Sequence, residues 1–172
     1  MCGVTGILHF GRPEAVSADL LHRMNNAIVH RGPDGDGTYV SDDGKVGLGH
    51  RRLSIIDLSE AGAQPMSNGE KTVWLSFNGE IYNHVSLRAE LEGRGYRFRS
   101  NHSDTEVLVQ GYQAWGMPGL LERLDGMYVF AVYDETVKRL SIARDRVGIK
   151  PVYFTKRAGV FAFASEIKAL LT

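Results

Sequence analysis

The spacing of hydrophobic and polar positions changes several times along the chain, and each change marks a predicted element. Residues 3–10 (GVTGILHF) are short and rich in β-forming side chains, so they predict a strand with Cys2 at its exposed start. Ser17 then offers a helix N-cap. After it, apolar residues recur at the spacing of an amphipathic helix: Leu20, Leu21, Met24, Ala27 and Ile28. The chain therefore begins with a strand and a helix that packs one face on a core.

The next part of the chain predicts a loop and then short strands. Glycine, proline and aspartate make residues 30–37 (HRGPDGDG) a long turn or loop. Asp42-Asp43-Gly44 and Asn68-Gly69 are typical hairpin turns. The strands predicted around them are 38–41, 46–50, 53–56 and 72–78.

Helical spacing then returns twice before a final group of strands. Asn83 can cap a helix that carries Val85, Leu87 and Leu91 on one face. Ser103 and Glu106 fit a capping box, and the helix that they open runs to Gly116. The remaining predicted elements are a helical turn at 119–124, strands at 127–133, 139–144, 151–155 and 160–164, and a helix at 166–171.

Strands grouped around a central pair of helices indicate an α+β fold with largely antiparallel sheets. Two sheets with apolar faces and helices outside them would stack as helix, sheet, sheet, helix. A length of 172 residues fits one domain that buries about 70% of its unfolded surface. The chain stops two residues after Leu170, in or at the end of a predicted helix, so we expect it to be part of a longer protein.

Composition excludes several classes of function. Twenty basic and twenty acidic residues give a formal charge of +0, so nothing marks a nucleic-acid or membrane-surface binder. One cysteine excludes an internal disulfide framework and fits a reducing compartment. No signal peptide or membrane-spanning stretch is seen, and the six histidines are scattered without metal-ligand spacing. We therefore predict a soluble, cytoplasmic protein without a metal site.

The single cysteine, Cys2, lies where removal of Met1 would make it the N-terminal residue. Removal of Met1, which an aminopeptidase performs only before a small side chain, would leave Cys2 with a thiol and a free α-amine. The thiol has an ordinary pKa of about 8.5, and the α-amine, at about 7.7–8.0, is substantially unprotonated at neutral pH. The amine can accept the thiol proton directly or through a water. Cys2 would then be both nucleophile and base, although a small buried cysteine is the simpler interpretation of Met1-Cys2-Gly3 alone.

Four polar segments could complete a site, and each also has a plain structural interpretation. Residues 30–34 can be a solvated turn. Adjacent Arg51 and Arg52 point to opposite faces of a strand, so one can face a cleft and bind a carboxylate, or both can lie on the surface. Asn78-Gly79 is by itself typical of a type I′ turn, but its amide NH₂ and backbone N–H could form an oxyanion hole. Asp104 falls in the first turn of a helix, where it is favoured in any case, and could also bind an ammonium group. Together these groups suit an α-amino acid with a side-chain acyl group, such as glutamine.

Nine ordered motifs carry a resemblance that runs nearly from end to end. They are Cys2-Gly3, HRGPD (30–34), GHRRLSIIDLS (49–59), GAQPM (62–66), FNGEIYNH (77–84), SDTEV (103–107), LDGMYVFAVYD (124–134), RDRVGIKPVYF (144–154) and SEIKAL (165–170). In these motifs the chain resembles the N-terminal glutaminase domain of glutamine-hydrolysing asparagine synthetases. These are class II glutamine amidotransferases with the N-terminal nucleophile (Ntn) hydrolase fold, an αββα sandwich.

The resemblance implies a role for each matching residue. Cys2 would be the nucleophile, Asn78 and Gly79 the oxyanion hole, and Asp104 the group that binds the glutamine α-ammonium. Arg52 would bind the α-carboxylate with Arg51 as its outward neighbour. The remaining implied pocket residues are Leu53, Ser54, Ile55, Ile56 and Glu80.

The resemblance also implies partners outside residues 1–172. Ammonia would pass to a C-terminal synthetase domain that uses ATP and Mg²⁺ to convert aspartate to asparagine, and a homodimer is possible; no cofactor is expected in residues 1–172 themselves. A related amidotransferase with another acceptor, or a degenerate structural module, is the alternative. A chain that keeps Met1 would be dormant, because Cys2 then lacks a free amine.

Overall fold

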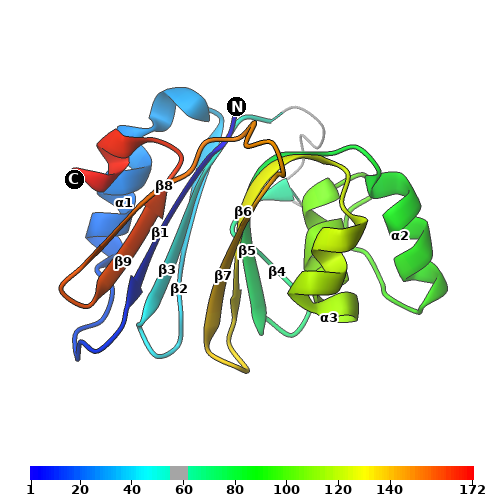
Figure 1. Cartoon of the computed structure of the whole chain (residues 1–172), viewed down its shortest axis with the longest axis horizontal. Coiled ribbons are helices and arrows are strands. Elements are labelled where there is room, and N and C mark those ends of the chain that lie inside the picture. The colour runs from blue at the N-terminus through cyan, green and yellow to red at the C-terminus, as the bar shows by residue number, and fades with distance from the viewer. Residues whose placement is uncertain (55–61) are drawn as a thin grey trace.

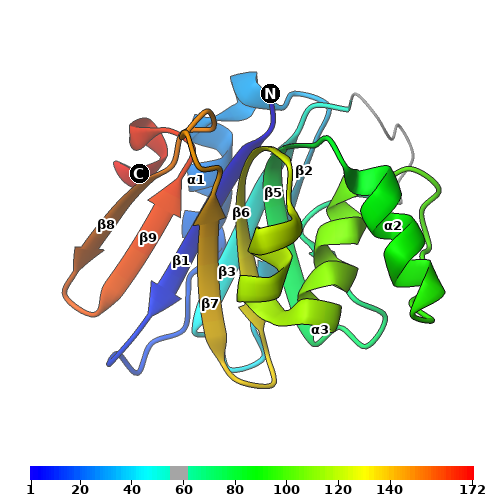
Figure 2. The same cartoon turned by 45° about the vertical axis from the view of Figure 1, so that its right-hand side comes forward.

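Two antiparallel sheets lie face to face in the middle of the molecule, and helices cover their outer faces (Figure 1). The computed structural model describes residues 1–54 and 62–172. The first sheet has the order β2-β3-β1-β9-β8 and the second β4-β5-β6-β7. The helix α1 and the short 3₁₀ helix η3 cover the first sheet, while α2 and α3 cover the second, as Figure 2 also shows. The predicted α+β four-layer arrangement is confirmed.

The bounds of the elements are close to those that the sequence predicts. The strands are β1 (Gly3–His9), β2 (Gly35–Val40), β3 (Val46–Arg52), β4 (Met66–Ser67), β5 (Val73–Ile81), β6 (Gly126–Asp134), β7 (Arg139–Arg144), β8 (Tyr153–Arg157) and β9 (Val160–Ala164). The helices are α1 (Ala18–Ala27), η1 (Val29–Arg31), α2 (His84–Gly93), α3 (Asp104–Arg123) and η3 (Ile167–Leu170).

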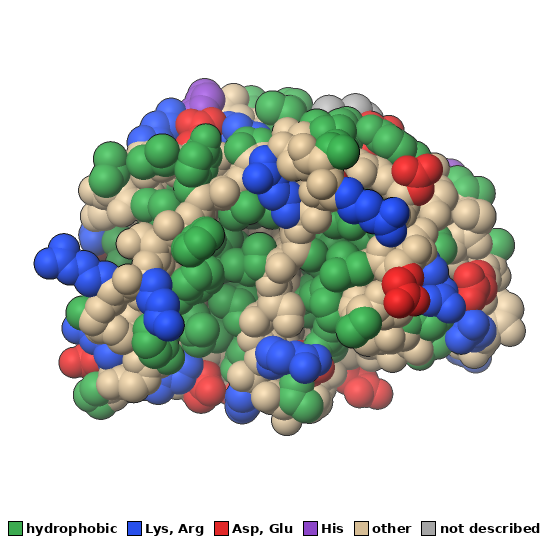
Figure 3. Space-filling model, viewed as in Figure 1, with side chains coloured by type: hydrophobic (Ala, Val, Ile, Leu, Met, Phe, Trp, Pro, Cys, Tyr) green, Lys and Arg blue, Asp and Glu red, His purple; other side chains and the backbone are tan. Residues whose placement is uncertain are grey.

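Among the described residues, three apolar clusters hold the layers together. One lies between α2, α3 and the second sheet and includes Leu91, Leu108 and Phe130. Another lies between α1, η3 and the first sheet, and the third, with Leu48, Tyr133 and Phe163, lies between the sheets. Figure 3 shows hydrophobic side chains exposed along the gap between the sheets on one face of the molecule.

Two hydrogen bonds cross from the first sheet to the second close to the centre. His50 Nε2 lies 3.0 Å from the Phe77 carbonyl oxygen, and Ser76 Oγ donates to the Gly49 carbonyl at 2.9 Å. The carbonyl can only accept, so Nε2 carries the proton and Nδ1, which has no partner among the described residues, is bare. Burial lowers the pKa of His50 to about 4, which keeps the ring neutral.

Several local features differ from the sequence-based predictions. Residues 35–37 belong to β2, because they pair with the end of β3. Leu53 and Ser54 are not in a strand, and residues 55 and 56 of the same predicted strand lie outside the described residues. Val85 is 69% exposed instead of packed on the core. The last helix is the 3₁₀ helix η3.

The helix caps are also only partly as predicted. Ser103 Oγ accepts the Glu106 N–H, as in a capping box, but the Glu106 carboxylate does not reach back to the N-cap. It accepts instead from the Arg99 and Ser100 N–H groups, both at 2.8 Å. Within the described part of the chain, the Asn83 side chain makes no capping hydrogen bond. The predicted break at Gly116 is confirmed, because this residue has φ 65° and kinks α3.

Candidate active site

A cleft with a volume of about 200 Å³ lies where the start of β1 meets the ends of β3 and β5 and the start of α3. Its size suits a ligand smaller than the drug-sized molecules bound by pockets of roughly 300–1,000 Å³. The predicted site residues that line it come from distant parts of the sequence: Cys2, Arg52, Leu53, Ser54, Asn78, Gly79, Glu80 and Asp104. Ile55 and Ile56, the other two predicted residues, lie outside the described residues.

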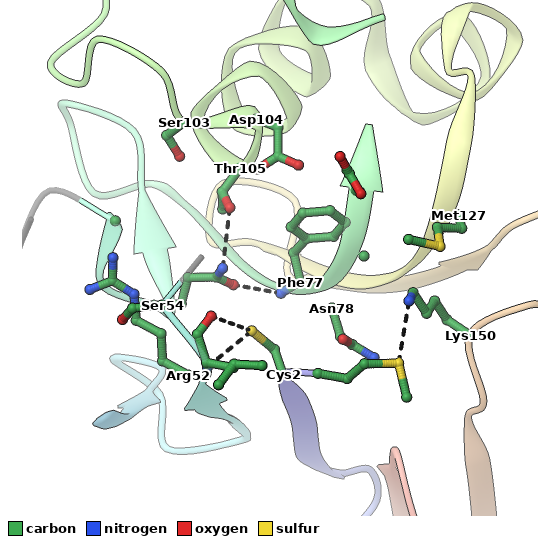
Figure 4. A pocket seen from close by; sticks show the side chains of 16 residues that line it. Cys2, Arg52, Ser54, Phe77, Asn78, Ser103, Asp104, Thr105, Met127 and Lys150 are labelled. Atoms are coloured by element: carbon green, nitrogen blue, oxygen red, sulfur yellow. Dashed lines mark hydrogen bonds between the residues drawn. The ribbon is translucent and has the colours of Figure 1, made fainter. Parts of the chain in front are cut away.

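Cys2 is held at this cleft by contacts to its backbone and to its thiol, and Figure 4 shows those of the thiol. The Leu53 N–H donates to Cys2 Sγ at 3.4 Å, and Sγ lies 3.6 Å from the Leu53 carbonyl oxygen. Arg31 Nε donates to the Cys2 carbonyl at 3.0 Å. The sulfur is therefore fixed beside the residue that follows β3.

The HRGPD segment, residues 30–34, supports this arrangement from behind. Asp34 Oδ2 accepts the Ser54 N–H at 2.9 Å, and the Asp34 N–H donates to the Arg52 carbonyl at 3.0 Å. A Cβ at Gly32 would lie 2.4 Å from the Arg51 carbonyl carbon, so only glycine permits this approach. His30, Pro33 and Asp34 are exposed, as in a solvated turn, but the segment also positions Cys2 and the wall formed by residues 52–54.

The two adjacent arginines differ in their surroundings. Arg52 lines the cleft. Arg51 does not, but it is only 8% exposed and pairs with Asp36 at 3.3 Å. The prediction of Arg51 as an outward-facing residue is thus wrong, because its side chain is buried and pairs with Asp36 on the neighbouring strand β2.

Asn78 and Gly79 lie inside β5, so the type I′ turn interpretation is wrong. The Asn78 side chain is buried, and its Nδ2 has no hydrogen-bond partner among the described residues. A Cβ at Gly79 would lie 2.2 Å from the Met127 carbonyl oxygen, so the close packing on β6 requires glycine here. A buried amide without a partner normally costs stability, which indicates that Asn78 is kept for a ligand.

The strand pattern places the Gly79 N–H at the same cleft. In an antiparallel strand, alternate residues direct their N–H groups to opposite edges. The Phe77 N–H donates to Gln64 Oε1 at 2.7 Å, and the Ile81 N–H donates to Asp104 Oδ2 at 3.2 Å. Gly79 lies between these two residues on the edge that borders the cleft. Its N–H and the Asn78 amide can therefore serve one bound oxygen.

Asp104 is the buried acid of the cleft. Ser103 caps α3, so Asp104 occupies the first turn of that helix and lines the cleft from above β5 (Figure 4). Burial raises the pKa of Asp104, while the hydrogen bond from the Ile81 N–H and the charge of His84 oppose this rise. Glu80 is exposed, at the rim of the cleft.

Some lining residues received no role from the sequence. They are Gln64, Phe77, Thr105, Met127 and Lys150, together with Met1 and Gly62. Gln64 and Lys150 occur in the GAQPM and RDRVGIKP motifs, and this was the available signal. Gln64 links the walls of the cleft, because its Nε2 donates to Thr105 Oγ1 at 3.2 Å while its Oε1 binds Phe77 N–H.

The described part of the chain has neither a metal-binding cluster nor a membrane-spanning helix. Residues 1–54 and 62–172 contain no group of three or more His, Cys, Asp or Glu side chains that could hold a metal ion. None of the helices in these ranges has the length and apolar character needed to cross a bilayer.

Comparison with known proteins assigns the family. A protein-family model described as "Glutamine amidotransferase domain" matches residues 1–172. The chain belongs to the glutamine amidotransferase domain family. Of solved structures, the glutamine phosphoribosylpyrophosphate amidotransferase of B. subtilis is similar to this domain with a TM-score of 0.81 and 24% identity, over 98% of this chain and 43% of that one. This likeness confirms the Ntn hydrolase fold.

Curated relatives of this glutamine amidotransferase domain are considerably longer. The chain is 46% identical to "Asparagine synthetase [glutamine-hydrolyzing] 1" of Bacillus subtilis (strain 168), over 99% of this chain and 27% of the relative. It is 42% identical to "Asparagine synthetase B [glutamine-hydrolyzing]" of Escherichia coli (strain K12), over 99% of this chain and 30% of the relative. The domain therefore spans less than a third of these relatives.

Proposed function

We propose that this domain, once Met1 is removed, hydrolyses the side-chain amide of glutamine to glutamate and ammonia. The observation that carries the proposal is the buried Asn78 amide, which has no partner among the described residues and lies in the same cleft as Cys2. A degenerate structural module would have no reason to keep an unsatisfied donor beside a thiol.

The cleft offers a complementary group for each end of glutamine. Arg52 suits the α-carboxylate, because a guanidinium binds a planar carboxylate through two parallel hydrogen bonds. Asp104 suits the α-ammonium. Leu53, Ser54 and Glu80 complete the wall around these groups, and Asn78 with Gly79 receives the side-chain carbonyl oxygen.

Cys2 supplies both the nucleophile and the base for the reaction. Its α-amine takes the thiol proton as sulfur adds to the amide carbon, and the carbonyl electron pair moves to oxygen, where Asn78 and Gly79 stabilise the charge. The C–N bond breaks, and the proton leaves with nitrogen as ammonia. Water then adds to the thioester and gives one proton to the amine. The C–S bond breaks while the protonated amine returns that proton to sulfur, which releases glutamate and restores both the thiol and the free amine.

The longer protein is a further part of the proposal. The names of the relatives support ammonia delivery to a C-terminal synthetase domain, with residues 1–172 as the N-terminal glutaminase domain. We expect ATP and Mg²⁺ to be bound there while aspartate is converted to asparagine. A homodimer, the cytoplasmic location and the absence of a cofactor in this domain remain predictions.

The test is a glutaminase assay with the intact mass measured on the same sample. We expect glutamate release from the chain without Met1 and none from Cys2→Ala. Alanine is also small enough to permit Met1 removal. Because the substitution removes only the sulfur, this variant should fold normally and bind glutamine. A fully processed chain that neither releases glutamate nor binds glutamine in calorimetry would overturn the proposal. A chain that retains Met1 should be inactive, because its Cys2 nitrogen is an amide.

A further inference from the structure

Lys150 is a buried cation at the cleft for which the hydrolysis described above has no use. It lies in the segment between β7 and β8, and only 5% of its surface is exposed. Its backbone is fixed, because its N–H donates to Asp145 Oδ2 at 3.0 Å and its carbonyl accepts from Arg144 Nε at 2.6 Å. The side chain is therefore aimed into the cleft by a rigid turn.

Among the described residues, the ammonium group lacks an anionic partner. Its hydrogen-bond partner there is Met1 Sδ, at 3.4 Å, and no carboxylate oxygen in residues 1–54 and 62–172 lies within 4.0 Å of Nζ. A thioether is a weak acceptor, and a buried charge is costly unless it is paired. Removal of Met1 would also remove this contact. Lys150 would then face the space beside the Cys2 amine.

The position of Lys150 along the cleft indicates what it would bind. Figure 4 shows Lys150 and Arg52 on opposite sides of Cys2, with Asn78 at the side of Lys150. If Arg52 and Asp104 hold the α-carbon end of glutamine, the side-chain end lies toward Lys150. There the carbonyl oxygen becomes negative in both tetrahedral intermediates, and the product acquires a γ-carboxylate.

We propose that Lys150 is a further catalytic residue, whose ammonium stabilises the negative charge that develops on the glutamine side-chain oxygen beside Asn78 and Gly79. The proposal rests on the function proposed above. The role of Lys150 is then electrostatic and confined to the reacting end of the substrate. Because glutamine is neutral at that end, Lys150 should add little to the affinity for glutamine itself.

The kinetic test uses Lys150→Met, which keeps the length and apolar stem of the side chain and removes the charge. We expect kcat for glutamine hydrolysis to fall roughly 10- to 100-fold, while KM changes less than about 3-fold. The midpoint of urea unfolding should stay the same or rise, because an unpaired buried charge is lost. Lys150→Arg should retain part of kcat, and Lys156→Met, at an exposed lysine of β8, should match the parent.

A binding test in the Cys2→Ala background separates the two proposals, because no turnover occurs there. Calorimetry should show glutamate bound at least about 10-fold more weakly after Lys150→Met, and glutamine less than about 3-fold more weakly. Equal weakening of both ligands, or an unchanged kcat with unchanged glutamate binding, would overturn the role of Lys150. A Cys2→Ala parent that binds neither ligand would instead overturn the proposed function, and this role with it.

Discussion

At the scale of single residues, the cleft combines groups that are each poorly satisfied by the protein itself. Asn78 Nδ2 and the Lys150 ammonium are buried without a strong partner among the described residues, and Asp104 is an acid with a raised pKa. Such groups cost stability, and their concentration in one cleft is typical of a site that is completed by its ligand. The sequence indicated Asn78 and Asp104 through motifs. It did not indicate Lys150, because nothing in RDRVGIKP shows that its side chain turns inward.

Asn78→Ala removes one of the two donors proposed for the oxyanion. We expect kcat to fall by about 10²–10³-fold, since one such donor is worth roughly 2.7–4 kcal/mol in the transition state. KM should change little, because the ground-state carbonyl gains less from the donor. Steady-state kinetics measure both values, and Asn101→Ala, at an exposed residue, is the matched control. A large rise in KM with normal kcat would contradict the oxyanion role.

Asp104→Asn keeps the size of the side chain and an acceptor for the Ile81 N–H, but it removes the charge. We expect KM for glutamine to rise at least about 30-fold, because loss of one member of a buried ion pair costs roughly 2 kcal/mol or more. Burial raises the pKa of Asp104 in the folded state, so its ionisation at neutral pH lowers stability. The substitution should therefore raise the urea midpoint at pH 7 while it weakens binding. A lower midpoint would contradict this assignment.

At the scale of elements, the sequence predicts strands and helices well where the pattern is long and regular. Residues 46–50, 72–78 and 127–133 lie in or directly beside strands, because alternation and β-forming side chains agree there. Prediction from the sequence fails where tertiary contacts determine the local structure. Asn78-Gly79 has the composition of a turn. The strand stays extended there because it pairs with β6 on one edge, and because the neighbouring Phe77 and Ile81 N–H groups donate to Gln64 and Asp104 on the other. Arg51 is buried and pairs with Asp36 of β2, a contact that no local pattern reveals.

The hydrogen bond from His50 to Phe77 makes the contact between the two sheets sensitive to pH. The pKa of His50 falls from 6.5 to about 4 on folding, so the unfolded chain binds a proton more readily and stability falls as pH decreases from 6.5 toward 4. When the pH is well below 4, His50 has lowered the free energy of unfolding by about 3 kcal/mol. Urea unfolding at pH 7 and pH 5 should show a smaller difference for His50→Gln than for the parent. His22→Gln, at an exposed residue of α1, should behave like the parent.

At the scale of the whole molecule, the site depends on both ends of the chain. The Val4 N–H donates to Ser165 Oγ at 3.0 Å, and Glu166 Oε1 binds Arg31 Nη1 at 3.1 Å, while Arg31 holds the Cys2 carbonyl. Although burial alone would raise the pKa of Glu166, hydrogen bonds from His30, Arg31 and Lys168 lower it to about 2, so it stays ionised. The four-layer fold was predictable from the order of elements. This link between residues 2 and 166 was not, because it arises only when β1 and β9 pair.

Glu166→Ala tests whether this link positions the nucleophile. Arg31 would lose its carboxylate partner, and a small shift of the Cys2 backbone should lower kcat about 10-fold, since a displacement of about 1 Å can cost up to roughly 10². KM should stay within about 3-fold, because Glu166 does not line the cleft. Lys168→Ala removes an exposed neighbour that also binds Glu166 and should leave kcat nearly unchanged. Equal effects of the two substitutions would contradict a specific role of Glu166.

The bond between Val4 and Ser165 also has a consequence for the time at which Met1 can be removed. These residues are 161 positions apart, so the ribosome needs roughly 8–30 s to make Ser165 after Val4, at about 5–20 residues per second. During that interval β1 can already pair with β3, but the bond to Ser165 and the contact of Met1 with Lys150 cannot form, so an aminopeptidase meets a less firmly held N-terminus. Once β9 has paired with β1, Met1 Sδ is in contact with Lys150 inside the cleft. Formation of the proposed nucleophile therefore depends on whether the processing enzyme acts before translation and folding are complete, and slowing elongation should increase the fraction of chains that begin with Cys2.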